Sequence, residues 1–144
     1  AEHTMSFSLS KVENYIYTLL YGKVSTNVYL GSLPATLNTD EEDMVLIDCG
    51  LKIDDRDAYA KGPINIFLYV KPLERGRKNI KRMLEMEDAL QDIIRNQSDD
   101  NYMLNILYTS ADYDSTYSMH FNIYALNLII WHKRKPFSPR RKRL

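Results

Sequence analysis

Two acidic clusters are the first residues whose type and spacing could support metal binding or acid–base chemistry. Asp54, Asp55 and Asp57 could offer oxygen ligands to a hard cation, but the Asp-x-Asp-x-Asp-Gly pattern with a distal Glu that builds an EF-hand is absent. The second cluster, at residues 40–43, lacks the spacing of a paired acid and base. Because runs of like charge are usually solvated, we predict exposed loops here and no metal site.

The nucleophile that the chain offers is Cys49, which is its only cysteine. A pairing with His120 across a sheet is conceivable, but a thiol at the end of an apolar strand is usually inert packing. The phosphate-binding patterns GxxxxGK[ST] and GxGxxG do not occur. We therefore predict no catalytic residue, no cofactor and no enzymatic activity, and a single cysteine permits no disulfide within the chain.

Positive charge gathers at the start of the predicted second helix, at Arg75, Arg77 and Lys78. The N-terminus of a helix favours anions, so these side chains could contact a phosphate or a carboxylate of a partner. The alternative is a solvated first turn that Glu85 and Glu87 balance further along the helix. We predict a contact with a partner or a polyanion at these three residues.

A second group of cations lies at the C-terminus, where residues 133–144 carry seven basic side chains and no acidic one. They are Lys133, Arg134, Lys135, Arg140, Arg141, Lys142 and Arg143. The whole chain has 19 basic and 19 acidic residues and a net charge of zero, so the remainder is acidic. We expect the tail to be disordered, because it has few apolar groups to bury. It could bind nucleic acid, lie along an acidic neighbour, or serve only solubility.

Tyrosine is abundant, with eleven residues against four Phe and one Trp. The tyrosines gather on the predicted first helix and the last hairpin, so not all of them can lie in one core. Tyrosine is enriched at protein interfaces because its ring is apolar and its hydroxyl is polar. We predict an interface between copies at Tyr17, Tyr21, Tyr113 and Tyr117.

The elements that must position these residues follow from hydrophobic periodicity. Helical spacing after a capping box, Ser10 to Glu13, predicts a first helix over residues 10–21, and a second apolar stripe, interrupted by Glu87, predicts a helix within residues 77–96. Period-two or compact apolar runs predict five strands. These strands cover residues 27–30, 44–49, 64–70, 102–109 and 118–131.

The order of these elements predicts the fold class. Consecutive strands joined by polar loops favour an α+β fold with a mainly antiparallel sheet of about five strands and two helices packed on one face. At 144 residues the chain suits one domain. We expect that domain over residues 5–132, with residues 1–4 as a vector-derived extension. The apolar run 119–131 is too short to cross a bilayer as a helix, so we predict no membrane partner.

The same succession of elements resembles the tail terminator and tail-completion proteins of long-tailed bacteriophages. The resemblance covers residues 8–131: an amphipathic helix, three strands ending at 64–70, Lys71-Pro72 with a turn at Gly76, a long helix and a closing hairpin. It does not extend to the basic tail.

This resemblance implies a non-enzymatic structural protein that assembles as a ring, commonly a hexamer, to cap the tail tube and join it to the head. The partners would be further copies of the chain and other tail or connector proteins of the virion, with assembly in the host cytoplasm. The sheet and first helix would supply the subunit interface. The alternative, from the residues alone, is a small nucleic-acid-binding accessory protein that uses the basic tail.

Overall fold

A six-stranded sheet and two helices form the structure, a computed structural model that describes residues 8–35, 41–53, 59–96 and 102–131. The helices are α1 (Leu9–Leu20) and α2 (Ile80–Arg95), and a 3-10 turn, η1 (Glu74–Gly76), precedes α2. The strands are β1 (Val28–Leu30), β2 (Asp43–Cys49), β3 (Lys52–Ile53), β4 (Tyr59–Val70), β5 (Tyr102–Asp114) and β6 (Met119–Trp131).

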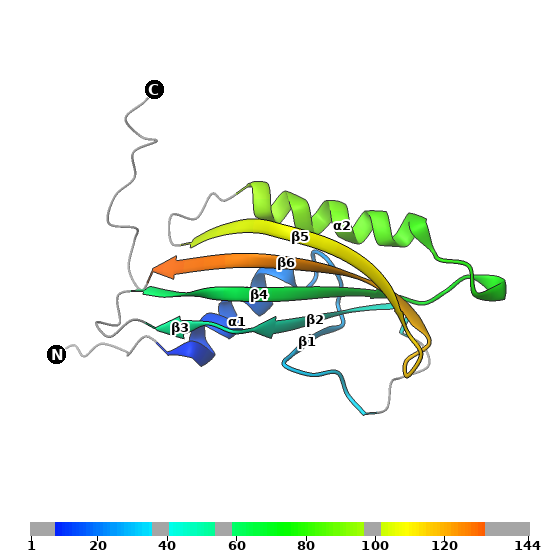
Figure 1. Ribbon diagram of the computed structural model, residues 1–144, viewed down its shortest axis with the longest axis horizontal. Helices are drawn as coiled ribbons and strands as arrows, with labels where there is room; N and C mark the ends of the chain where they lie inside the picture. Colours follow the sequence, from blue (N-terminus) through cyan, green and yellow to red (C-terminus); the bar gives the residue numbers. More distant parts are fainter. Residues whose placement is uncertain (1–7, 36–40, 54–58, 97–101, 132–144) are drawn as a thin grey trace, which may run out of the picture.

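The strand order is β1-β2-β4-β6-β5, with the short β3 also paired to β4 (Figure 1). Every pairing is antiparallel except that of β1 with β2, which is parallel. The α+β class with a mainly antiparallel sheet is therefore confirmed. The sheet has six strands and not about five, because residues 52–53, which lie between two predicted strands, pair with Lys61 and Ala60.

Both helices begin with a side-chain cap and bury one stripe. The Ser8 hydroxyl accepts a hydrogen bond from the Lys11 N–H at 3.3 Å, so α1 begins at Leu9 and the predicted Ser10 cap is wrong. Asn79 accepts from the Arg82 N–H at 3.1 Å at the start of α2. The buried stripes are Val12, Ile16 and Leu20 on α1, and Met83, Met86, Leu90 and Ile94 on α2.

Two strands are longer than their sequence pattern indicates. Strand β4 begins at Tyr59, where we expected a strand only from Ile64, because Tyr59 pairs with Trp131 of β6. Strand β5 continues through residues 110–114, which we had predicted as a loop, since each of these polar residues has a partner on β6. The turn is short because the Asp114 carboxylate accepts the N–H of Thr116 at 2.9 Å.

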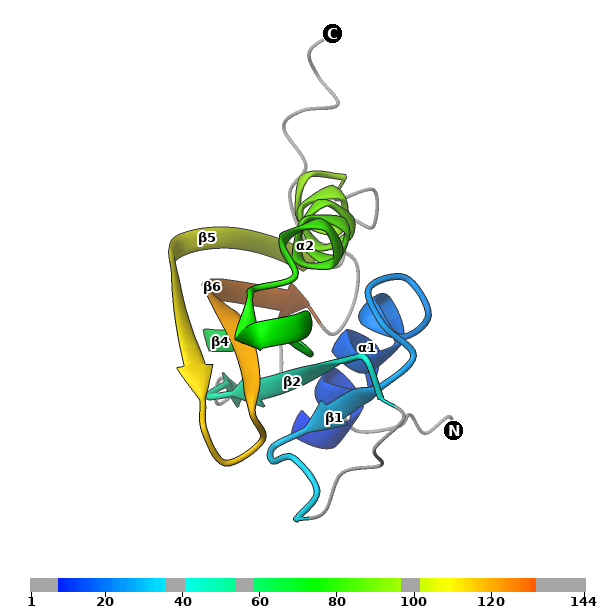
Figure 2. The same ribbon diagram turned by 90° about the vertical axis from the view of Figure 1, so that its right-hand side faces the viewer.

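The main core lies between the sheet and the helices. In Figure 1 the strands face the reader and α1 lies behind them, and Figure 2 shows both helices on one side. Residues alternate along β4 and β6, so one set, including Ile66, Leu68 and Leu126, packs against the helices with 1% exposure or less. Burying one such side chain contributes about 1.5–3 kcal/mol.

The opposite face of the sheet carries a second apolar cluster. Met44, Tyr69 and Met119 are buried there, and the partly buried members are Tyr29, Leu33, Leu46, Phe67, Tyr117 and Phe121. The hairpin of β5 and β6 bends towards this face (Figure 2), and the Tyr117 hydroxyl donates to the Pro34 carbonyl at 2.9 Å. The bent hairpin and the segment after β1 therefore cover one end of this face.

Candidate assembly surface

The two edges of the sheet differ in length. Strand β1, at one edge, has three residues, whereas β5, at the other, has 13. Within the described part of the chain no further strand pairs with the outer side of β5. A strand edge presents a row of backbone N–H and C=O groups that can pair with another strand. Strand β5 thus offers the longer of the two ladders for such a contact.

The outer half of β5 exposes several large apolar side chains. Leu107 and Tyr108 are each 61% exposed, Tyr113 is 47% and Ile106 is 42%. Residues 105–111 include no charge, no proline and no glycine, which are the groups that usually protect an edge strand from pairing. Figures 1 and 2 both show this half of β5 bending away from α2. The strand is therefore accessible along its outer half.

A β-bulge at Leu107 divides β5 into two parts. Ile106 pairs with Leu126, but Tyr108 pairs with the preceding residue of β6, Ala125, so Leu107 has no partner. A bulge bends and twists the strand that contains it. From Tyr108 the pairing with β6 is regular as far as Asp114 and Met119. Residues 108–114 therefore form a regular ladder between the bulge and the turn.

A polar network fixes α2 to the strand next to β5. The Glu87 carboxylate accepts from the Tyr124 hydroxyl at 2.8 Å and from the Asn122 amide at 2.9 Å. Lys78 donates to the Asn122 oxygen at 2.9 Å, and Gln91 donates to the Tyr124 hydroxyl at 2.9 Å. Glu87 interrupts the apolar stripe of α2 because it satisfies polar groups of β6, and the network positions the hairpin relative to the helices.

Burial raises the pKa of two tyrosines that hold the hairpin. The pKa of Tyr69 rises to about 12 through burial and then the Asp114 carboxylate, to which its hydroxyl donates at 3.3 Å. Burial also raises the pKa of Tyr124 to about 12, and the hydrogen bond to Glu87 adds to the rise. Both hydroxyls therefore remain protonated, and able to donate, well above the ordinary pKa of 10.0.

We expect the free energy of unfolding to fall as the pH rises from 10 towards 12. Each of these hydroxyls ionises less readily in the folded chain than in the unfolded one. Their contribution to the free energy of unfolding is complete below the pKa that they have in the unfolded chain. It is lost as the pH rises through the pKa that they have in the folded chain. Urea titrations at several pH values would measure this, and a Tyr69→Phe, Tyr124→Phe variant should show a shallower decline. Equal declines in both proteins would contradict the assignment.

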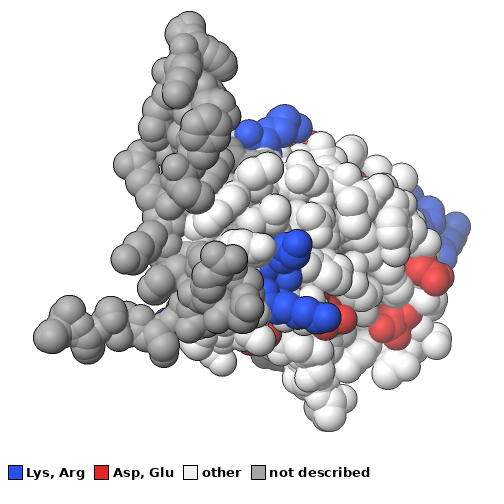
Figure 3. Space-filling view, turned by 60° about the vertical axis from the view of Figure 1, so that its left-hand side comes forward, with Lys and Arg blue, Asp and Glu red and all other residues white. Residues whose placement is uncertain are grey.

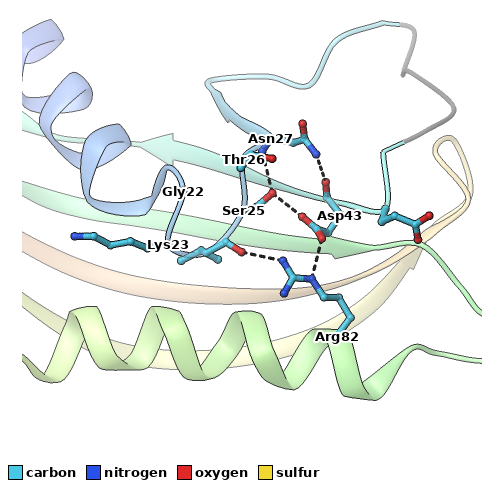
Figure 4. A pocket seen from close by; sticks show the side chains of 9 residues that line it. Gly22, Lys23, Ser25, Thr26, Asn27, Asp43 and Arg82 are labelled. Carbon is cyan, nitrogen blue, oxygen red and sulfur yellow. Dashed lines mark hydrogen bonds and ion pairs between the residues drawn. The ribbon is translucent and has the colours of Figure 1, made fainter.

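A polar hollow of about 480 Å³ lies where the segment before β1 meets α2 (Figure 4). Its central cation is Arg82, whose Nε lies 2.8 Å from Asp43 Oδ2. The other two guanidinium nitrogens donate to Glu85 at 3.0 Å and to the Val24 carbonyl at 3.2 Å. The Ser25 hydroxyl donates to Asp43 at 2.6 Å. With all its nitrogens engaged, Arg82 joins α2 to β2 and acts as a structural clamp.

The structure separates the three cations predicted near the start of α2. Arg75 and Arg77 are exposed on and directly after η1, whereas Lys78 is half-buried and donates to Asn122. Arg75 has a φ of 62°, in the left-handed region. Lys78 thus has a structural partner, and a partner contact at Arg75 and Arg77 stays a prediction. The predicted cations of the tail, residues 133–144, lie outside the described residues.

The four predicted interface tyrosines belong to two separate places. Tyr17 and Tyr21 stack at the end of α1, with ring centroids 5.5 Å apart, and Tyr21 is 49% exposed. Tyr113 is exposed on β5, whereas Tyr117 packs into the second apolar cluster. An interface at these residues stays a prediction. The neighbouring apolar residues of β5 were not among the predicted sites, although the uncharged run at residues 105–111 could have indicated them.

The pairing of Cys49 with His120 that we considered from the sequence does not occur in the structure. Cys49 lies opposite Ile64 of β4, and His120 lies opposite Val70. Six residues of extended strand separate these positions by roughly 20 Å. Burial, followed by the Glu13 and Asp48 charges, raises the pKa of the Cys49 thiol to about 12, so the nucleophilic thiolate is disfavoured.

Two further features concern metal ions and membranes. Among residues 8–35, 41–53, 59–96 and 102–131, no three His, Cys, Asp or Glu side chains gather as metal ligands would. The candidate Asp54, Asp55 and Asp57 lie outside these ranges. In the same ranges neither helix has the length and apolar character needed to cross a membrane.

The chain matches no protein-family model and no curated protein. Several solved structures resemble it, and two of these do so at low identity. One is the sheath/tube terminator of the extracellular contractile injection system PVC in its extended state, with 11% identity, a TM-score of 0.41, and coverage of 94% of this chain and 62% of the other. The second is a crystal structure from Akkermansia muciniphila, with 13% identity, a TM-score of 0.34, and coverage of 66% and 45%. The chain spans less than two thirds of the length of either.

Proposed function

We propose that this protein is a structural component that works by self-association, assembling as a ring in the manner of the tail terminators that its sequence resembles. The ring would cap a tube and join it to neighbouring tail or connector proteins of a virion or related particle. Six copies per ring is the number that the resemblance suggests. The basic tail is available to contact the acidic body of a neighbouring copy.

The observation that carries this proposal is the exposed outer half of β5, in which residues 105–111 carry no charge. A monomer that leaves the outer half of β5 exposed, with Leu107 and Tyr108 each 61% exposed, presents groups that favour pairing with another chain. An assembled protein would bury them. Figure 3 shows a face on which charged side chains are few and lie between wide uncharged areas, which also suits contact with further protein.

The size of the protein in solution tests the proposal. Native mass spectrometry and light scattering over a range of concentrations should find closed oligomers in multiples of the 16.9 kDa chain, and electron microscopy should show rings. A protein that stays monomeric at high concentration would remove the support. Salt-dependent DNA binding that disappears when residues 133–144 are deleted, together with a monomeric protein, would favour the nucleic-acid-binding alternative.

Charge placed on the exposed strand is expected to weaken this assembly. Tyr108→Glu should raise the dissociation constant at least about tenfold, because a carboxylate would be buried without a partner at the contact. The matched control is Leu84→Glu, which is 52% exposed in the monomer and lies on α2, from which the outer half of β5 bends away (Figures 1 and 2). Analytical ultracentrifugation of both variants would measure the difference. Equal weakening in the two variants would argue against β5 as the contact.

A further inference from the structure

We infer that two copies of the protein join through β5, with residues 108–114 of each strand paired antiparallel about a two-fold axis at Ala111. This inference rests on the proposed function and specifies the contact through which the copies associate. It follows from three features of the structure: the limits of the regular ladder, the positions of its charges, and the shortness of the other sheet edge.

The limits of the ladder place the axis. The bulge at Leu107 ends the regular pairing on one side, and the turn that begins at Ser115 ends it on the other. If the regular segment between them, residues 108–114, pairs with the same segment of a second copy over its full length, its middle residue lies on the two-fold axis. That residue is Ala111, whose small side chain can lie beside its own copy without a clash.

The charges of the segment favour the antiparallel direction. Asp112 is exposed, and Asp114 lies at the end of the strand. A parallel pairing in register would bring each carboxylate beside its own copy, and like charges directly opposite each other are destabilising. The antiparallel pairing places Asp112 opposite Ser110, and Asp114 opposite Tyr108. A hydroxyl donor then faces each carboxylate.

The remaining positions of the segment are also compatible with this pairing. Thr109 would lie opposite Tyr113, a β-branched residue beside an aromatic ring, which is a favourable cross-strand pair. The Tyr113 N–H donates to the Asp112 carboxylate of its own strand at 2.8 Å. In the paired form that N–H can donate to the Thr109 carbonyl of the second copy, and the Asp112 carboxylate can accept from Ser110.

The other edge of the sheet is a poor partner for β5. Strand β1 has three residues, Val28–Leu30, so a head-to-tail contact between β5 and β1 would form only a short ladder. Pairing of β5 with β5 uses seven residues from each copy. A two-fold contact presents the same surface on both copies, so a ring that contains it has an even number of subunits and a second kind of contact.

Cysteine cross-linking tests the register directly, in a Cys49→Ser background that removes the native thiol. Ala111→Cys should cross-link with itself under mild oxidation at least about tenfold faster than Tyr108→Cys, since only the residue on the axis faces its own copy at disulfide distance. Thr109→Cys mixed with Tyr113→Cys should cross-link as a pair. Neither of these two variants should cross-link efficiently alone.

The outcomes separate this inference from the proposed function. If Thr109→Cys cross-links with itself more efficiently than Ala111→Cys, the register is wrong. If none of the cysteines cross-links while the unmodified protein still forms oligomers, the β5 contact is wrong and the structural role stands. If the protein is monomeric throughout, both fail.

Discussion

Replacing Gly62 by alanine is expected to reduce the free energy of unfolding by about 3 kcal/mol or more. Gly62 lies within β4 with a φ of 147°, and a Cβ added there would lie 2.5 Å from the carbonyl oxygen of Gly50 and 3.1 Å from the Cα of Leu51. Both are backbone atoms, so the clash can be relieved only by moving the segment between β2 and β3 away from β4.

Gly31→Ala is the matched control for this substitution. Gly31 also has a positive φ, of 83°, but its added Cβ would meet no atom within 4 Å. Only the cost of the left-handed backbone applies there, about 1 kcal/mol. Urea denaturation followed by circular dichroism would measure both variants. Similar losses at the two positions would show that the contact with Gly50 does not set the cost.

Replacing Glu87 by alanine should cost about 2–3 kcal/mol, because the Tyr124 hydroxyl and the Asn122 amide would lose their common acceptor. Tyr124 is only 2% exposed, so water cannot readily replace the lost carboxylate. Glu87→Gln keeps one acceptor oxygen on a side chain of the same length, so its loss in the free energy of unfolding should be about half as large. Thermal and chemical denaturation of both variants would check the ratio.

A double-mutant cycle separates the hydrogen bond from the packing of the Glu87 side chain. Tyr124→Phe removes the donor and leaves the ring in place, so Glu87→Ala should cost less in that background than in the unmodified protein. Additive losses would mean that Glu87 acts through its helix or its other contacts and not through Tyr124.

Glu87 also shows where prediction from the sequence succeeds and where it fails. The apolar period of residues 80–94 correctly predicts the helix, because the periodicity is local. The sequence also shows that Glu87 interrupts the stripe, but its partners come from β6, more than 30 residues later. Which polar group a carboxylate will meet depends on the register of distant strands, and hydrophobic periodicity does not contain that information.

The candidate contact strand was harder to identify for a similar reason. We expected this strand to end before Ser110, because the residues from there on are polar. In the structure these residues pair with β6, and the strand continues to Asp114. Whether a strand lies at the edge or in the centre depends on the order of the whole sheet. Of the four tyrosines that we predicted as an interface, only Tyr113 belongs to the exposed edge.

The shortness of β1 limits how far the sheet can grow. When two copies pair through β5, the joined sheet ends on each side in a β1 strand of three residues, which is too short to bind and order another incoming chain. Growth of the sheet therefore stops after one pairing, and cross-β fibrils, which need a long free edge at each end, have no site for elongation. Concentrated samples should accordingly form discrete particles and remain clear.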